Sequence, residues 1–388
     1  MHTLPAKRLD WVDNLRVALI VLVVAHHAAQ AYGPDDWWYV QDQPGAGPLA
    51  TFSAVNGTFF MSLFFFVSAF LAPAALDRHG PRAFLTGRLR RLVIPLLVGA
   101  VTIVPGLMYA YYTRYRGYPP IDLPTYVIDV YLGFGERPAG WTGPSWPDLQ
   151  FAHLWFIQNL FVYSLLYLVC HQLAQRLRRG TRGPARRVPG HLALVGLTGA
   201  VAVGTFLIRL WYPLDEWVAV LDFLQVEPAR LVQYATFFAL GVLAARHDWL
   251  TRLPARVGWV WLGAGTALTA GLFAAGADTP VFAGGGATVE SLLWSLYESV
   301  SCTGLSVGLL VLFREFCRRG TRFTRSLAAS SFTVYIVHVP VVVAVQFALA
   351  GSGLGALASF AVTAVAGVAV SFAAAELLRR LPGFRAVL

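Results

Sequence analysis

Long apolar stretches recur along the whole chain, and short polar segments separate them. Runs of about 18 or more mostly apolar residues are long enough to cross a bilayer as helices. Such runs lie near residues 13–32, 54–76, 92–112, 152–175, 191–211, 230–246, 257–276, 289–313, 328–350 and 354–378. The pattern predicts an all-α fold, a polytopic membrane helical bundle of about ten transmembrane helices.

Basic residues gather on alternate connecting segments. The N-terminus, the C-terminus and the segments after the second, fourth, sixth and eighth runs together hold 24 of the 30 Lys and Arg. The opposite segments carry acids, among them Asp35, Asp122, Asp148, Glu216 and Glu227. Because Lys and Arg are enriched in cytoplasmic loops, we expect both termini in the cytoplasm.

Composition supports a membrane protein with little mass outside the bilayer. Hydrophobic residues make up 57% of the 388 positions and charged residues 13%, which is about half the charge of a soluble protein. We expect a single domain over residues 1–388. The net charge of +10 is explained by topology signals, so no nucleic acid binding is expected. Asp13 and Asn14 interrupt any signal-peptide core, so the first helix is expected to stay.

The three cysteines, Cys170, Cys302 and Cys317, show neither metal-ligand spacing nor a disulfide framework, and no metal site is expected.

Arg16 and His27 break the apolar character of the first run. They are eleven positions apart, which is about 20° from a whole number of helical turns and a rise of about 16 Å. They therefore share one helix face, one near each side of the membrane, whereas His26 falls about 80° away. Ionisable residues are costly inside a spanning helix, so this pair indicates function.

Further polar residues stand inside or at the edges of other runs. Arg88 and Arg91 open the third run and share a helix face. Glu298 lies about nine residues into the eighth run, where an isolated carboxylate needs a partner. A histidine would serve, because a carboxylate that orients an imidazole makes a competent general base. His338 fits helix packing as well as chemistry, and His153 is expected to be a structural or interfacial residue.

Aromatic residues are dense in the long external segments, for example Trp37, Trp38, Tyr39, Trp141 and Trp146. We favour an aromatic belt at the membrane interface. A platform for a sugar or polyketide acceptor is the alternative.

Cations at the inner surface and a base further out suit a cytosolic acyl-CoA as the donor substrate, with no permanently bound cofactor. Arginines would bind its phosphates. Its pantetheine arm would carry the thioester up the helix to His27, which would deprotonate a hydroxyl arriving from the outer side. No nucleophile motif such as GxSxG appears near a suitable turn, so direct transfer is favoured over an acyl-serine. The sequence identifies no oxyanion donor.

Five segments resemble, in order, the landmarks of acyltransferase family 3, the integral membrane O-acyltransferases. The resemblance covers nearly the whole chain, although Ala69 stands where many members have glycine. The segments read DNLRVALIVLVVAHH, LFFFVSAFL, FLTGRLRRLVIP, HLWFIQNLFVY and SSFTVYIVHVPVV.

The resemblance implies transfer of an acetyl, succinyl or similar group from a cytoplasmic donor. The acceptor would be a hydroxyl of a glycan or of a secreted natural product, and the location a bacterial cytoplasmic membrane. His27 would be the catalytic base, and Arg16, Arg88 and Arg91 would serve the donor. Glu298 is assigned as catalytic from its depth and chemistry, not from a motif.

Two alternatives remain. A multi-span transporter of a small anionic or glycan-type substrate would also bury charges, but inverted repeats are not evident. A non-catalytic scaffold would tolerate Asn or Gln at position 27. The sequence leaves open whether the chain forms a homo-oligomer.

Overall fold

The computed structural model describes residues 9–33, 38–41, 45–143, 145–177, 187–221, 223–276 and 284–387. Several residues named above lie outside these ranges. They are Asp35, Trp37, the basic residues before position 9 and most of the arginines between the fourth and fifth spans.

Ten helical segments of the described residues are long and apolar enough to cross a membrane, which confirms the expected number. The third is a composite of four consecutive helices. The first two segments are α1 (Asp10–Gln30) and α2 (Gly47–Phe70). The third consists of α3 (Ala72–Arg88), η1 (Leu89–Val93), α4 (Ile94–Thr102) and α5 (Val104–Tyr115). The other seven are α7 (Trp155–Leu177), α8 (His191–Arg209), α9 (Pro228–Arg246), α11 (Ala255–Ala274), α13 (Val289–Phe316), α14 (Arg322–Leu349) and α15 (Ala356–Arg380).

The composite third segment is the main departure from the expected boundaries. The apolar run predicted near 92–112 is preceded by α3, a polar helix that follows α2 almost directly. Gly80 breaks α3 with φ of 76°, a left-handed conformation that favours glycine, and Pro81 follows it. The segment η1 is π-helical, which widens the helix at the arginine motif.

Six short elements lie in the described parts of the connections, and the sequence did not predict the two strands. The strands β1 and β2 form an antiparallel hairpin between α8 and α9, pairing Val218 with Val226. The six are α6 (Leu123–Thr125), η2 (Tyr126–Tyr131), η3 (Ala152–Leu154), β1 (Val218–Val220), β2 (Leu224–Val226) and α10 (Trp249–Arg252). After α15, the short helix α16 (Phe384–Val387) adds a final turn.

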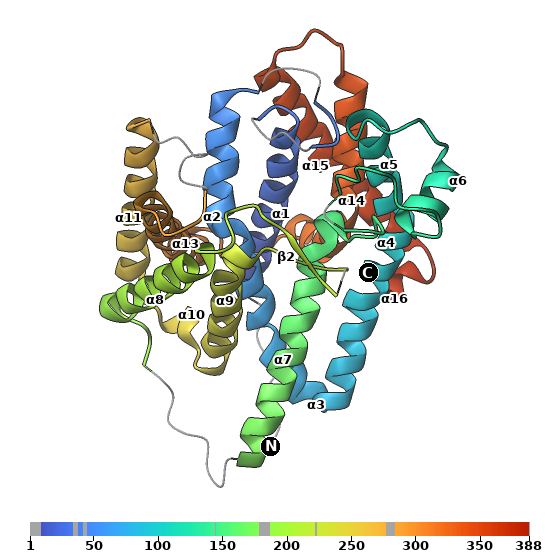
Figure 1. The fold of residues 1–388 in the computed structure, drawn as a ribbon. Coiled ribbons are helices and arrows are strands. Elements are labelled where there is room, and N and C mark those ends of the chain that lie inside the picture. The colour runs from blue at the N-terminus through green and yellow to red at the C-terminus, as the bar shows by residue number, and fades with distance from the viewer. Residues whose placement is uncertain are drawn as a thin grey trace.

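The helix α1 lies at the centre of the bundle (Figure 1) and packs against α2, α13, α14 and α15. Helices α8, α9, α11 and α13 form one flank, with α14, α15, α4 and α5 on the other. Outward-facing apolar side chains such as Leu97, Val101, Val195, Val203 and Val365 are exposed in the protein. These surfaces suit contact with lipid tails, since a bilayer replaces water there.

The helices α2 and α9 approach closely at Gly241. A Cβ at this position would overlap the carbonyl oxygen of Phe66 and stand 2.9 Å from the Cβ of Ala69. Small residues allow such approaches between membrane helices. Ala69 is therefore accommodated because the facing residue is a glycine.

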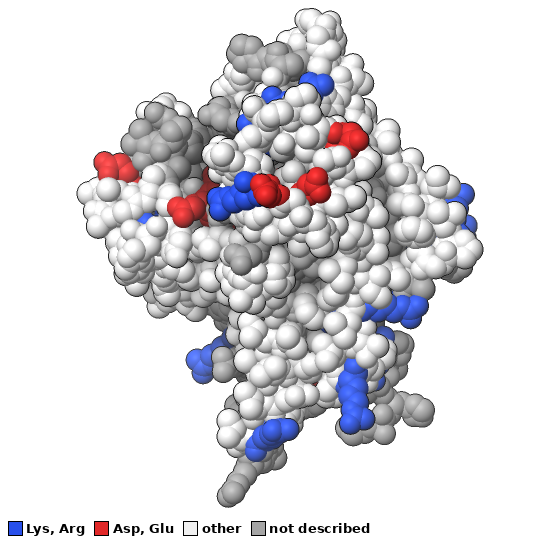
Figure 2. All heavy atoms as spheres, turned by 45° about the vertical axis from the view of Figure 1, so that its right-hand side comes forward, with Lys and Arg blue, Asp and Glu red and all other residues white. Residues whose placement is uncertain are grey.

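Charge is distributed unevenly over the surface. On the face shown in Figure 2, acidic residues gather in the upper half, and most basic residues lie along the lower and right-hand edges. This separation agrees with the alternation of charge along the chain. The cytoplasmic placement of both termini stays a prediction from that alternation.

Candidate active site

His27 is oriented by the main chain of its own helix. Its Nδ1 lies 2.9 Å from the carbonyl oxygen of Val23, one turn earlier in α1. A carbonyl only accepts, so the proton of the neutral imidazole is on Nδ1. The lone pair is then on Nε2, which has no hydrogen-bond partner among the described residues. The ring is half-buried, so Nε2 is the atom available to take a proton from a substrate.

His338 of α14 faces the same nitrogen of His27. Its Nε2 lies 3.2 Å from His27 Nδ1, while its Nδ1 lies 2.7 Å from the carbonyl oxygen of Tyr335. Because that carbonyl fixes the proton of His338 on Nδ1, its Nε2 accepts from His27. His338 is fully buried and contributes to orienting His27, which goes beyond helix packing.

His153 completes a row of three histidines. Its ring lies 5.4 Å from the ring of His338, and its Nε2 donates to the carbonyl oxygen of Ile336 at 2.9 Å. Tyr335 donates its hydroxyl to the carbonyl oxygen of His153. His153 is buried inside the protein, so it is not an interfacial residue, and its structural role stays a prediction. In the described part of the chain, these histidines belong to no group of ligands that could hold a metal ion.

Trp38 and Gln346 lie beside His27. The indole of Trp38 donates to Gln346 Oε1 at 2.7 Å, and its ring lies 5.6 Å from the imidazole of His27. Gln346 in turn donates to the carbonyl oxygen of Ala28 at 3.2 Å. Trp38 is buried, so it packs within the protein and is not part of an interfacial belt.

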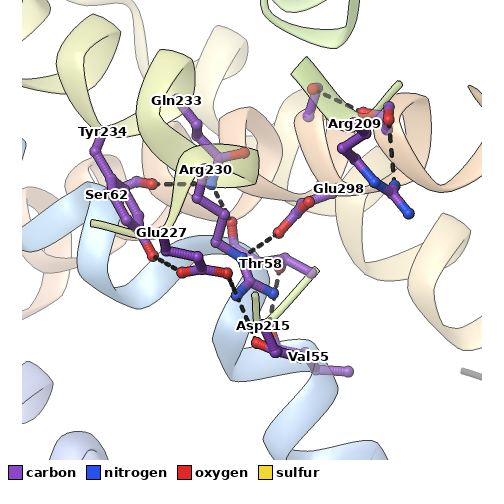
Figure 3. Close-up of polar contacts among 12 residues, drawn as sticks. Val55, Thr58, Ser62, Arg209, Asp215, Glu227, Arg230, Gln233, Tyr234 and Glu298 are labelled. Carbon is purple, nitrogen blue, oxygen red and sulfur yellow. Dashed lines mark hydrogen bonds and ion pairs between the residues drawn. The ribbon is translucent and has the colours of Figure 1, made fainter. Parts of the chain in front are cut away.

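The prediction that a histidine is the partner of Glu298 is wrong. Glu298 Oε1 accepts from Nε of Arg230 in α9 at 2.7 Å, and Arg230 also pairs with Glu227 and Asp215 (Figure 3). Helix periodicity places a residue on a face but does not say which helix meets that face. The orientation of His27 comes instead from Val23 and His338.

Arg230 is the centre of a buried charged cluster. Glu298 and Glu227 are almost fully buried, whereas Asp215 is 71% exposed. Glu227 precedes α9, and burial raises its pKa to about 7 while Arg230 opposes that shift. Sequence reasoning missed Arg230. The signal was available, because Arg230 is a basic residue on the side of the membrane where acids predominate, three positions after Glu227.

The predicted donor-binding arginines lie at helix ends. Arg16 Nη1 is 3.3 Å from Oδ1 of Asp13 in the same helix. Arg88 is half-buried with its guanidinium 5.0 Å from the ring centre of Phe84, and Arg91 is exposed in the π-helical turn. The wider turn means that Arg88 and Arg91 are less closely aligned than an α-helix would make them.

The external aromatic residues form a small core of their own. Trp141 stacks on Tyr118 with ring centres 5.7 Å apart, and the guanidinium of Arg116 lies 4.4 Å from the Trp141 ring centre. Arg116 also pairs with the buried Asp148 at 3.2 Å. Burial raises the pKa of Asp148, and Arg116 lowers it. Trp141 is buried and its ring is in contact with Tyr118 and Arg116, which fits neither a belt nor an open platform for a sugar.

Curated relatives share the length of this chain. Glucans biosynthesis protein C of Escherichia coli O139:H28 is 24% identical over 365 residues, covering 88% of this chain and 83% of that protein. The proteins of the same name from Salmonella heidelberg and Salmonella typhimurium are each 23% identical over 360 residues, covering 88% of this chain and 84% of theirs. No solved structure matches the chain significantly.

A family model described as an acyltransferase domain matches residues 9–376. The match includes the spans that carry His27, the arginine motif and His338. It agrees with the order of motifs found along the sequence and with the ten-span bundle. The chain therefore belongs to acyltransferase family 3 and is a membrane acyltransferase.

Proposed function

We propose that this enzyme moves an acyl group from a cytoplasmic acyl-CoA to a hydroxyl of a glycan or a secreted natural product, with His27 as the general base. The fixed tautomer of His27 carries the proposal, since it leaves the lone pair on Nε2 of a residue that is only half-buried. The name of the relatives, glucans biosynthesis protein C, favours a glucan-type acceptor. The basic inner loops and the bacterial relatives support a place in the cytoplasmic membrane.

The transfer is direct. The acceptor oxygen attacks the thioester carbonyl as Nε2 of His27 takes the hydroxyl proton. The tetrahedral intermediate then collapses, the carbon–sulfur bond breaks, and the protonated His27 returns the proton to the departing CoA thiolate. While His27 is protonated, Val23 and His338 still accept from Nδ1, so the charged ring keeps its orientation.

The donor enters from the arginine side. Arg16, Arg88 and Arg91 supply positive charge for the phosphates of the acyl-CoA, for which guanidinium groups are well suited. The rise of about 16 Å from Arg16 to His27 along α1 suits the reach of a pantetheine arm.

Turnover of acyl-CoA by detergent-purified protein tests the base. His27→Ala should lower kcat by about 10²–10⁴-fold while acyl-CoA binding is retained. His79→Ala is the matched control, because His79 makes the same Nδ1 contact to a carbonyl one turn earlier, at 3.1 Å, but is exposed. If the wild type neither binds nor consumes any acyl-CoA, transfer is wrong and transport of a small anionic or glycan-type substrate becomes the leading function.

The donor site has a test of its own. Arg88→Ala and Arg16→Ala should each raise the KM for acyl-CoA by about tenfold, the loss expected for one charge-assisted hydrogen bond. The neighbouring exposed Arg90 provides the control, and Arg90→Ala should leave this KM unchanged. Equal effects of the three substitutions would mean that the arginines act only as topology signals.

A further inference from the structure

Four buried polar atoms around the outer half of α2 have no hydrogen-bond partner among the described residues. They belong to side chains of four different helices: His26 Nδ1 in α1, Asn56 Nδ2 in α2, Gln233 Oε1 in α9 and Glu298 Oε2 in α13. Asn56, Gln233 and Glu298 are each at least 95% buried. A buried polar atom without a partner costs free energy, so a group of them indicates a place that a polar ligand fills.

One segment of α2 connects the first two of these side chains. The ring of Phe60 lies 4.9 Å from the ring of His26. Asn56 is one turn before Phe60, so it lies on the same face of α2 as the ring that contacts His26. The face of α2 that contacts His26 therefore also carries the unpartnered amide nitrogen of Asn56, one helical turn away.

The adjoining face of α2 lies near the other two side chains, Gln233 and Glu298. Gln233 donates to the carbonyl oxygen of Thr58 at 2.8 Å. Nη2 of Arg230 lies 3.5 Å from the place that a Cβ of Gly57 would take, and Nε of Arg230 holds Glu298. Residues 56–60 of α2 thus lie beside all four side chains.

The four atoms divide into two donors and two acceptors. Gln233 uses its amide nitrogen on Thr58 and Ser62, which leaves Oε1 as an acceptor. Glu298 uses Oε1 on Arg230, which leaves Oε2. The amide of Gln30 lies 3.2 Å from Nε2 of His26 and donates to it, so His26 carries its proton on Nδ1. Asn56 Nδ2 is the second donor. Adjacent hydroxyl groups of one ligand, each able to donate and accept, match this set.

We infer that His26, Asn56, Gln233 and Glu298 form a subsite for the hydroxyl groups of a sugar acceptor, and that Arg230 positions Glu298 within it. The ring of His26 lies 5.5 Å from the ring of His27, so a sugar held there would bring one of its hydroxyls to the base. The inference rests on the proposed function, to which it adds the side chains that select the acceptor.

Calorimetric binding of a β-linked glucose disaccharide to the detergent-purified full chain, without acyl-CoA, tests the subsite. Asn56→Leu and Gln233→Leu should each weaken binding about tenfold or more and leave acyl-CoA binding unchanged. Because leucine at position 56 removes an unpartnered amide nitrogen, Asn56→Leu should bind the disaccharide more weakly and also keep or raise the midpoint of thermal unfolding. That combination separates lost recognition from a misfolded variant. Gln233→Leu also loses the hydrogen bonds to Thr58 and Ser62, so its midpoint should fall.

Ser371→Ala is the matched control. Ser371 is fully buried in α15, its hydroxyl has no partner among the described residues, and its loss should not change disaccharide binding. Equal affinity of the wild type and both leucine variants would overturn the subsite, and a wild type that does not bind the disaccharide would overturn the sugar assignment. If the wild type binds the disaccharide but consumes no acyl-CoA, the subsite stands and the acyl-transfer proposal fails.

Discussion

The proton-bearing nitrogen of His27 faces one side chain, His338, in addition to the carbonyl of Val23. A histidine in this place accepts a hydrogen bond without adding a negative charge inside the membrane. If His27 is the base as proposed, the carboxylate that orients the base in many hydrolases is here replaced by a neutral ring, which avoids the cost of burying an anion.

We predict that His338→Leu lowers kcat about tenfold, since the hydrogen bond from His27 Nδ1 to Val23 remains and only one of two acceptors is lost. His338→Gln, which keeps an acceptor oxygen, should recover part of the activity. Steady-state kinetics with acyl-CoA checks both, and the KM of the donor should stay constant. Equal activity of the two variants would show that His338 serves packing alone.

At the residue scale, sequence reasoning was strongest where one helix sufficed. Arg16 and His27 were singled out because both stand within one apolar run and their spacing can be converted to an angle and a rise. Glu298 was recognised as needing a partner, but Arg230 stands 68 positions away on another helix. Pairing between helices depends on how each is rotated about its axis, and no local pattern records that.

At the scale of helices, Arg230 joins α9 to α13 and to the segment before α9. Arg230→Met would leave the buried carboxylates of Glu227 and Glu298 uncompensated, which typically costs about 3–5 kcal/mol. We therefore expect a clearly lower midpoint of thermal unfolding in detergent. Asp215→Asn removes the exposed partner and should cost no more than about 1 kcal/mol. Similar midpoints for both variants would mean that the cluster adds no stability.

Gly241 controls the approach of α9 to α2. Gly241→Ala would place a methyl group against the Phe66 carbonyl and should destabilise the protein by about 1–3 kcal/mol. Gly263→Ala in α11 is the matched control, because no atom of the described residues lies within 4 Å of the added methyl group. Alanine there should be neutral or stabilising. Thermal unfolding of the pair measures the difference, and a midpoint for Gly241→Ala at or above the control would contradict the close contact.

The spans were predictable because each needs a long apolar run, whereas the short elements were not. The hairpin of β1 and β2 is only three residues per strand, and Gln225, the middle residue of β2, hydrogen-bonds through its main chain to Gln158 of α7. The helix α3 is too polar for the hydrophobic pattern of the sequence to predict it as part of a membrane span. Both depend on contacts with neighbouring helices.

At the scale of the whole molecule, alternating charge predicts the orientation in the membrane. In a variant without Cys170, Cys302 and Cys317, Ser352→Cys in the turn before α15 should react with a membrane-impermeant maleimide on intact spheroplasts. Arg318→Cys, in the exposed segment before α14, should react only after the membrane is opened. Labelling with the opposite pattern would invert the topology and place the arginines of the donor site outside the cell.

The acceptors that hold the three histidines are mostly main-chain carbonyls, those of Val23, Tyr335 and Ile336. A carbonyl oxygen is present whatever side chain its residue carries. The residues at the positions that supply these contacts can therefore change without disturbing the imidazole of His27, provided that the helix persists. Distant relatives could keep the same orientation of the imidazole with different residues at these positions, and a scan that replaces side chains one at a time would not detect these contacts.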